Sequence, residues 1–148
     1  MAGRIAGPVT ADFGKSDLAP VTAGERLHAS RGLEGVRGEA AAGFPSVRET
    51  ALPAMKRALA EGRSINDAAV LTLAELILRS EDTTFVKRCA GCDPAAYLRS
   101  VENALAADEP IKALFDADRL WSADGLSAGG CADLLALTLF MCFHLEKI

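Results

Sequence analysis

Glycine-rich segments that also carry charged residues are the first features of this sequence that could take part in binding or catalysis. In residues 35–45, glycines lie on both sides of Arg37 and Glu39, with Gly38 between them. Glycine lets a backbone approach a ligand closely, and the planar guanidinium of arginine can form two hydrogen bonds to a phosphate. The segment therefore predicts a phosphate-binding loop. The alternative is a surface loop with an internal ion pair.

Two adjacent carboxylates form the second such segment, Glu81-Asp82-Thr83-Thr84, which follows an apolar helical run. Carboxylates and hydroxyls are hard oxygen ligands of the kind that Mg²⁺ takes when it also binds substrate phosphates. Arg88 follows closely enough to bring positive charge to the same place. Two alternatives stay open: one carboxylate acts as a general base, or Asp82 or Thr83 caps the next helical turn.

The third segment, residues 127–133, opens the most apolar stretch of the chain. Gly129 and Gly130 precede a predicted helix, and free amides at a helix N-terminus attract phosphate. Asp133 then falls in the first turn of a helix that we expect to be buried. A carboxylate in such a dry cleft would suit proton or metal chemistry. The alternative is a favourable interaction with the helix N-terminus alone.

The elements that must position these segments are predicted to be helices. Apolar residues recur at helical spacing, and capping boxes occur at Thr22-Ala-Gly-Glu25 and Ser46-Val-Arg-Glu49. Asp93-Pro94 is an N-cap followed by proline at the first helical position. We expect an all-α fold, a compact bundle of about six helices with glycine-rich loops. The predicted helices cover residues 22–32, 46–62, 64–79, 93–105, 109–121 and 130–145, within one domain over 21–148 that follows a flexible arm over 1–20.

Composition narrows the class of protein. The chain has 148 residues, of which 50% are hydrophobic and only 5% aromatic. Its 28 alanines against 12 valines and isoleucines argue against an all-β fold. With a net charge of −4, we expect no nucleic acid partner, because proteins that coat nucleic acids are normally basic. The apolar stretch from Cys131 to Phe143 is shorter than the ~20 residues that span a bilayer, so we expect no membrane partner.

The four cysteines are relevant to the cellular compartment of the protein and to a possible metal or redox site. The first ten residues have no apolar core typical of a signal peptide, so we expect a reducing cytoplasm. Cys89-Ala-Gly-Cys92 has the spacing of zinc and redox motifs. Cys131 and Cys142 lie eleven residues apart in a helical run and complete no second motif. We favour ordinary thiols at Cys89 and Cys92, with a metal site and a redox pair as alternatives.

The three segments, in this order and spacing, resemble the C-terminal half of the triphosphoribosyl-dephospho-CoA synthase family. The similarity covers roughly residues 21–145. It runs through Thr22-Ala-Gly-Glu-Arg-Leu27, Gly35-Val-Arg-Gly-Glu-Ala40, Gly43-Phe-Pro-Ser-Val-Arg48, Leu52-Pro53, Ala58-Leu-Ala-Glu-Gly62, Glu81-Asp-Thr83 and Gly129-Gly-Cys-Ala-Asp-Leu-Leu-Ala136. The resemblance implies an all-α fold. It also implies transfer of a triphosphoribosyl group from ATP to the ribose 2′-hydroxyl of dephospho-CoA, with release of adenine, in the synthesis of the prosthetic group of citrate lyase or malonate decarboxylase.

The resemblance also suggests which residues act, and the individual roles are our hypothesis. Glu39 or Asp133 would activate the acceptor hydroxyl, and Glu81 and Asp82 would bind Mg²⁺ together with ATP. Phosphate and substrate contacts would come from Arg37, Gly38, Arg88, Gly129 and Gly130. Carboxylates near the ribose suit a displacement that develops oxocarbenium-like charge.

Departures from the family pattern keep further hypotheses open. The Asn-Thr-His-Lys segment of the family's N-terminal half does not occur, and Lys87-Arg-Cys-Ala-Gly91 replaces a His-Arg-Gly-Gly run. We therefore expect a homo-oligomer, or a second chain that supplies the missing half. Two alternatives are a non-catalytic nucleotide- or CoA-binding module derived from the family and an Mg²⁺-dependent nucleotide hydrolase.

Overall fold

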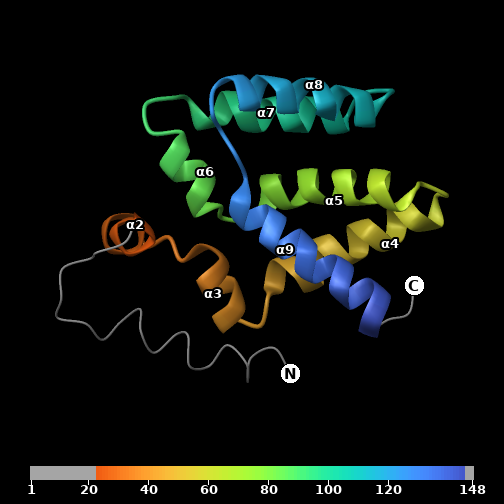
Figure 1. Ribbon diagram of the computed structural model, residues 1–148, viewed down its shortest axis with the longest axis horizontal. Helices are drawn as coiled ribbons and strands as arrows, with labels where there is room; N and C mark the ends of the chain where they lie inside the picture. Colours follow the sequence, from red (N-terminus) through yellow and green to blue (C-terminus); the bar gives the residue numbers. More distant parts are fainter. Residues whose placement is uncertain (1–22, 146–148) are drawn as a thin grey trace.

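The computed structural model describes residues 23–145, and this part of the chain is helical with no strand (Figure 1). The helices are α2 (Ala23–Arg31), α3 (Gly35–Ala41), α4 (Leu52–Ala60), α5 (Ile65–Arg79), α6 (Thr83–Arg88), α7 (Pro94–Leu105), α8 (Pro110–Ala123) and α9 (Gly129–Phe140). Two π-helical turns, η1 (Val47–Ala51) and η2 (Met141–Leu145), precede α4 and follow α9. The all-α prediction is confirmed. The predicted arm over residues 1–20 and the capping residue Thr22 lie outside the described residues.

Helix boundaries follow local capping signals where these are strong. The Ser64 hydroxyl accepts a hydrogen bond from the Asp67 amide at the start of α5. The Asp93 carboxylate does the same for the Ala95 amide at the start of α7, with Pro94 in the first turn. Gly32, with φ of +69°, ends α2 in the left-handed conformation that glycine adopts without strain. These predictions are confirmed because a cap depends on residues that are neighbours in the sequence.

Residues 32–45 differ from prediction, because a short helix, α3, lies within the expected loop. Glycines lower helix propensity, but packing overrides propensity here: α3 packs on α9, where the Val36 side chain approaches Gly130. The predicted capping box at Ser46 is also wrong. The Ser46 amide and hydroxyl both donate to the Glu39 carboxylate, so the partner comes from α3 and not from Glu49.

The helical turn in front of Pro53 is widened. The Leu52 amide donates to the Val47 carbonyl, five residues back, which makes η1 a π-helical turn. Proline has no amide hydrogen, and its ring clashes with the carbonyl four residues earlier in a regular α-helix. The π turn avoids this conflict, so the helix continues through Pro53 into α4.

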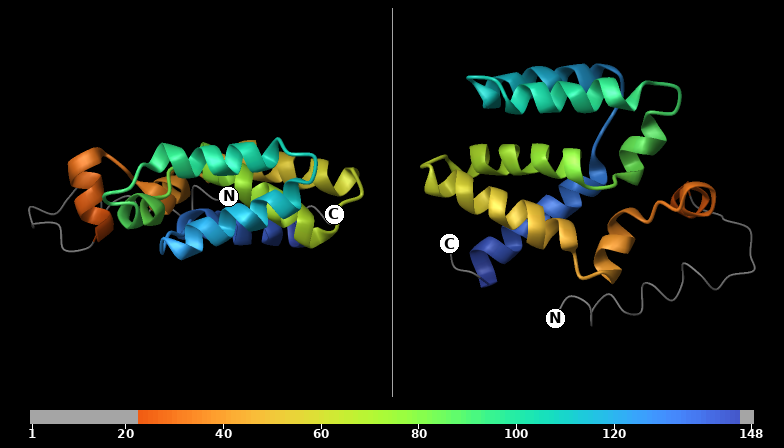
Figure 2. Two further views of the ribbon diagram at one scale, coloured as in Figure 1. Left: turned by 90° about the horizontal axis from the view of Figure 1, so that it is seen from above. Right: turned by 180° about the vertical axis from the view of Figure 1, so that it is seen from behind.

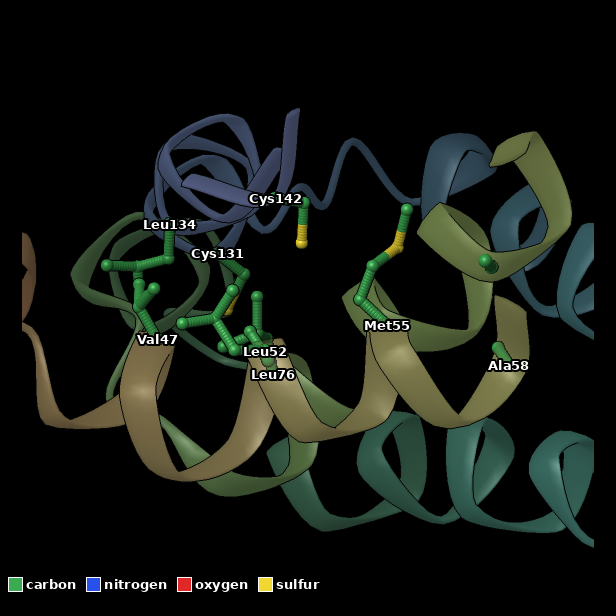
Figure 3. Close-up of a cluster of buried hydrophobic side chains, with 10 residues drawn as sticks. Val47, Leu52, Met55, Ala58, Leu76, Cys131, Leu134 and Cys142 are labelled. Carbon is green, nitrogen blue, oxygen red and sulfur yellow. The ribbon is translucent and has the colours of Figure 1, made fainter. Parts of the chain in front are cut away.

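Two clusters of buried side chains meet on α5. In the first, η1, α4, α5 and α9 enclose Val47, Met55, Leu76, Cys131 and Cys142, all at most 1% exposed (Figure 3). In the second, α6, α7 and α8 close over the other side of α5, where the rings of Phe85 and Trp121 stack at 4.7 Å. Figures 1 and 2 show α9 crossing α4 and α5 on one broad side of the molecule.

No helix of residues 23–145 is long and apolar enough to cross a membrane. The number of helices exceeds the prediction of about six, because α3 and α6 were not expected as separate helices. Both are short, and both lie in the segments that were singled out for chemistry.

Candidate functional site

The three predicted segments come together at one junction, where α5 ends and α3, α6 and α9 begin (Figure 1). Glycine makes the close approach possible. A Cβ atom on Gly35 would lie 2.8 Å from the Thr83 side chain, closer than real Cβ contacts. A Cβ atom on Gly129 would lie 3.3 Å from the Thr84 hydroxyl, and one on Gly130 would lie 3.3 Å from the Asp82 carboxylate. The glycines of the first and third segments therefore allow close packing against the second.

Asp82 connects two of these helices. Its carboxylate is buried, with the residue 7% exposed. Oδ1 accepts hydrogen bonds from the Thr84 amide at 2.8 Å and the Phe85 amide at 3.0 Å, which caps α6. Oδ2 accepts a third bond at 2.8 Å from the Cys131 amide, in the first turn of α9. Charge-assisted bonds and two helix N-termini together stabilise this buried carboxylate, so the capping alternative for Asp82 is confirmed.

An acidic pocket of about 340 Å³ lies beside Asp82. Its lining includes Gly38, Glu39, Ser46, Arg79, Ser80 and Glu81. A smaller cavity of about 180 Å³ shares Ser80 and Glu81 with it and reaches Asp82 and Cys131. We call the larger one the acidic pocket. Of the residues predicted from the sequence, it brings together Gly38, Glu39 and Glu81, and Asp82 lies directly behind them.

Three glutamates, Glu34, Glu39 and Glu81, line the acidic pocket, and their surroundings differ. Glu39 is half-buried, and its carboxylate accepts the Ser46 amide at 3.0 Å and the Ser46 hydroxyl, which fixes its position. Glu81 is exposed, and no hydrogen bond or ion pair holds it within the described part of the chain. Glu81 therefore has its oxygens available to a ligand, as does the exposed Glu34, whereas Glu39 is oriented in advance.

The residues Arg37, Arg88 and Asp133 are not brought into this pocket. Arg37 is exposed on α3 and lines neither cavity. The Arg88 guanidinium donates to the Gly125 carbonyl at 3.0 Å, so it holds the turn after α8. Asp133 is exposed on the outer side of α9, and the expectation of a dry cleft around it is wrong. An apolar sequence does not show which side of its helix stays uncovered.

The predicted phosphate seat at the start of α9 also needs correction. Gly130 is buried, and Gly129 is half-buried against Thr84. The Cys131 amide, which would face the phosphate, donates to Asp82 instead. The protein's own carboxylate thus takes the position at this helix N-terminus in which a ligand anion was expected.

Sequence reasoning missed Ser80 and Arg79. The Ser80 hydroxyl donates to the Leu76 carbonyl at 2.6 Å and lies 3.4 Å from the Cys131 sulfur. Arg79, in the last turn of α5, lines the acidic pocket, and its guanidinium pairs with Glu75 at 3.5 Å. Both residues directly precede Glu81 in the sequence, and this position could have indicated that they lie at the same site. Burial raises the pKa of the Cys131 thiol to about 12, which keeps this sulfur protonated and unreactive.

The structure joins Cys89 and Cys92 in a disulfide, so the preference for ordinary thiols is wrong. The pair closes the turn between α6 and α7, with Cys89 buried in the second core cluster. Cys131 and Cys142 are buried and form no disulfide, as their place in an apolar helix predicted.

The fit of a magnesium ion can be tested against these contacts. No group of three or more His, Cys, Asp or Glu side chains in residues 23–145 forms a preformed metal site. Three of the roughly four lone-pair positions of Asp82 are already used by backbone amides. Glu81 fits better, because Mg²⁺ often binds through one or two carboxylates plus substrate phosphates and water.

A cavity of about 500 Å³, larger than the acidic pocket, lies elsewhere, between α5 and α7, α8 and α9. Its walls are mainly apolar, with Trp121 and Leu114 among them and Asp118 as the single carboxylate. Size alone does not make it the chemical centre, because it lacks the converging polar groups of the acidic pocket.

Fold and site together define an all-α protein with an acidic pocket at a glycine-packed junction of helix ends. The chain matches, over residues 2–147, the family model CitG, described as ATP:dephospho-CoA triphosphoribosyl transferase. It therefore belongs to this family, as the resemblance of the three segments predicted.

Curated relatives carry the corresponding name. The chain is 42% identical over 124 residues to the 2-(5''-triphosphoribosyl)-3'-dephosphocoenzyme-A synthase of Pectobacterium atrosepticum, across 83% of this chain and 40% of the relative. It is 31% identical to a probable synthase of Lactiplantibacillus plantarum, across 88% of this chain and 48% of the relative. For a probable synthase of Malonomonas rubra the identity is 34%, across 78% and 38%. The chain thus spans less than half the length of these relatives. No solved structure matches it significantly.

Proposed function

We propose that this chain acts in the transfer of a triphosphoribosyl group from ATP to dephospho-CoA, with release of adenine. The observation that carries the proposal is that the three family motifs meet at one junction of helix ends. Segments 35–45, 81–84 and 127–133 are far apart in the sequence, yet glycines of the first and third pack against Thr83, Thr84 and Asp82 of the second. Glu39 of the first segment and Glu81 of the second line the acidic pocket at this junction. A pocket of about 340 Å³ is in the usual size range of ligand sites.

The proposed reaction breaks the bond between adenine and C1′ of the ATP ribose. A new bond forms from C1′ to the ribose 2′-hydroxyl oxygen of dephospho-CoA, and the proton of this hydroxyl passes to a base. Adenine leaves with the electron pair of the broken bond and takes up a proton. Positive charge develops at the ribose, and carboxylates fixed nearby stabilise it. Glu39 suits this role, because its two hydrogen bonds to Ser46 hold it in place without reorganisation.

We assign phosphate and metal handling to the rim of the acidic pocket. Glu81 is the residue that would hold Mg²⁺ together with triphosphate oxygens, and the ion supplies positive charge against the phosphates. Arg79 lines the same pocket and would add positive charge at its rim. Arg37, on the helix α3 that also carries Glu39, remains a predicted phosphate contact. Asp82 is reassigned to holding α6 and α9 in place.

We also propose that the working unit is larger than one copy of this chain, either a homo-oligomer or a complex with a chain that supplies the rest of the family fold. The support is the relatives' length, since matched segments make up 38–48% of them. A cytoplasmic location agrees with ATP and a coenzyme A precursor as substrates. In the alternative, the chain is a non-catalytic module that binds a nucleotide or CoA in the same pocket and does not carry out the transfer.

Adenine release tests the proposal. The chain is incubated with ATP and Mg²⁺, with and without dephospho-CoA, and free adenine is measured by chromatography. We expect adenine only when dephospho-CoA is present, in equal amount to the transferred triphosphoribosyl group. Phosphate release from ATP without acceptor would favour the hydrolase alternative. Nucleotide binding without any product would favour the binding module.

A further inference from the structure

The outer side of α9 leaves apolar side chains uncovered within residues 23–145. α9 has the sequence of a helix that is hydrophobic all round, and such helices are normally buried on every side. One side packs on α3, α5 and η1. The other carries the exposed residues Ala132, Ala136 and Phe140, continued by Phe143 in η2. Phe140 is 51% exposed. In Figure 1 no other described helix lies in front of α9.

We propose that this face, comprising Ala132, Asp133, Ala136, Phe140, Phe143 and His144, binds the same face of a second copy of the chain in an antiparallel arrangement. The inference rests on the proposed oligomer and not on the transferase chemistry. Below we call it the α9 face.

The sizes of the apolar side chains on the α9 face complement each other under a twofold axis. Ala132, Ala136 and Phe140 are spaced by four residues and form one ridge along the helix. Ala136 lies two residues before Thr138, and Phe140 lies two residues after it. An antiparallel pair crossing near residue 138 therefore sets each Phe140 ring against Ala136 of the other copy. Large side chains then meet small ones at both ends, which is what close packing of two identical surfaces requires.

The polar residues of the α9 face complement each other under the same axis. Asp133 lies five residues before Thr138, and His144 lies six residues after it. Both side chains are exposed. The crossing that pairs Phe140 with Ala136 therefore also brings Asp133 of each copy beside His144 of the other. A parallel pair would instead oppose the two Asp133 carboxylates and offers no such complementarity.

His144 is oriented within its own chain for this contact. Its imidazole stacks on the Phe140 ring, with 4.8 Å between the ring centroids and 15° between the planes. The α9 face has six side chains per copy, against roughly 20 or more per side in a standard stable interface. We therefore expect a dimer that forms in the micromolar range and dissociates on dilution.

Sedimentation velocity of the purified chain, without nucleotide, tests this directly. Wild type is expected to shift from monomer to dimer with rising concentration. Ala136→Glu places a charge at the crossing point and should weaken association at least about tenfold. Ala96→Glu is the matched control, because Ala96 is an exposed alanine on α7, away from this face, and it should change nothing. Circular dichroism verifies that both variants fold.

A charge swap tests the antiparallel register. His144→Glu sets two carboxylates together in the dimer and should weaken it, while the double variant Asp133→Lys, His144→Glu should restore it. A chain that stays monomeric at every concentration overturns the proposal. So does a dimer that Ala136→Glu leaves intact, or one that the charge swap fails to rescue. None of these results depends on adenine release, so a failure here is distinct from failure of the proposed reaction.

Discussion

Replacing Asp82 by asparagine removes the charge that caps two helices while keeping the size and shape of the side chain. The amide oxygen of asparagine can still accept the Thr84 and Phe85 amides. Its nitrogen then faces the Cys131 amide, where two donors meet and the 2.8 Å bond is lost. A buried hydrogen bond to a charged group contributes about 1.5–3 kcal/mol. Weaker interaction with two helix N-termini adds about 0.5–1 kcal/mol for each helix.

We therefore expect Asp82→Asn to lower the free energy of unfolding by about 3 kcal/mol, a large part of the roughly 5–15 kcal/mol of a small domain. The melting temperature should fall by about 10 °C. Urea denaturation and thermal melting followed by circular dichroism measure both quantities.

Asp93→Asn is the matched control for this prediction. Asp93 also caps a helix, but it is exposed, and its carboxylate accepts only one backbone amide, that of Ala95, besides a surface contact with Arg99 at 3.4 Å. Asparagine is as good an N-cap as aspartate, so the cost should be at most about 0.5 kcal/mol. Equal losses for Asp82→Asn and Asp93→Asn would refute the conclusion that Asp82 holds two helices together.

Three further outcomes follow from the same contacts. Gly130→Ala should cost about 2 kcal/mol in urea denaturation, because the added methyl group lies 3.1 Å from Val36 and 3.3 Å from Asp82. Reduction of the Cys89–Cys92 disulfide, which closes a short loop, should lower stability by about 2 kcal/mol, and a Cys89→Ser, Cys92→Ser variant should not respond to reductant. The raised pKa of Cys131, about 12 when folded, means that its contribution to stability is complete below the pKa of the unfolded thiol and declines as pH rises toward 12. Cys131→Ala should flatten that alkaline decline, and an unchanged slope would contradict the assignment.

Features set by neighbouring residues could be predicted from the sequence. Asp93 caps α7 as expected, and Ser64 caps α5 at the start of the helix predicted over 64–79, because a cap needs only the next few amides. The order of the three motif segments also predicted the family, which the match over residues 2–147 confirms.

Features set by distant residues could not be predicted. The second oxygen of Asp82 accepts a hydrogen bond from the amide of Cys131, 49 residues further along the chain. The residues around Asp82 in the sequence do not indicate this contact. Ser46 donates to Glu39 across the turn between α3 and η1. This contact replaces the capping box that was predicted between Ser46 and Glu49. The glycines at the start of α9 were interpreted as open to phosphate, but they are small because other helices approach them.

Asp133 illustrates a limit of hydrophobic patterns. An apolar helix has no polar stripe to indicate which side faces solvent. The prediction of burial therefore gave the correct class of helix but the wrong environment for this carboxylate, which is exposed on the α9 face.

We propose that the acidic pocket receives ATP together with Mg²⁺ through Glu81. The most direct test is calorimetric titration of the chain with ATP, with and without Mg²⁺, in wild type, Glu81→Gln and the control Glu102→Gln, whose side chain is exposed on α7. We predict that Mg²⁺ strengthens ATP binding in wild type and Glu102→Gln, and that Glu81→Gln removes most of this gain, at least about tenfold in affinity. An equal gain from Mg²⁺ in all three proteins would contradict the account.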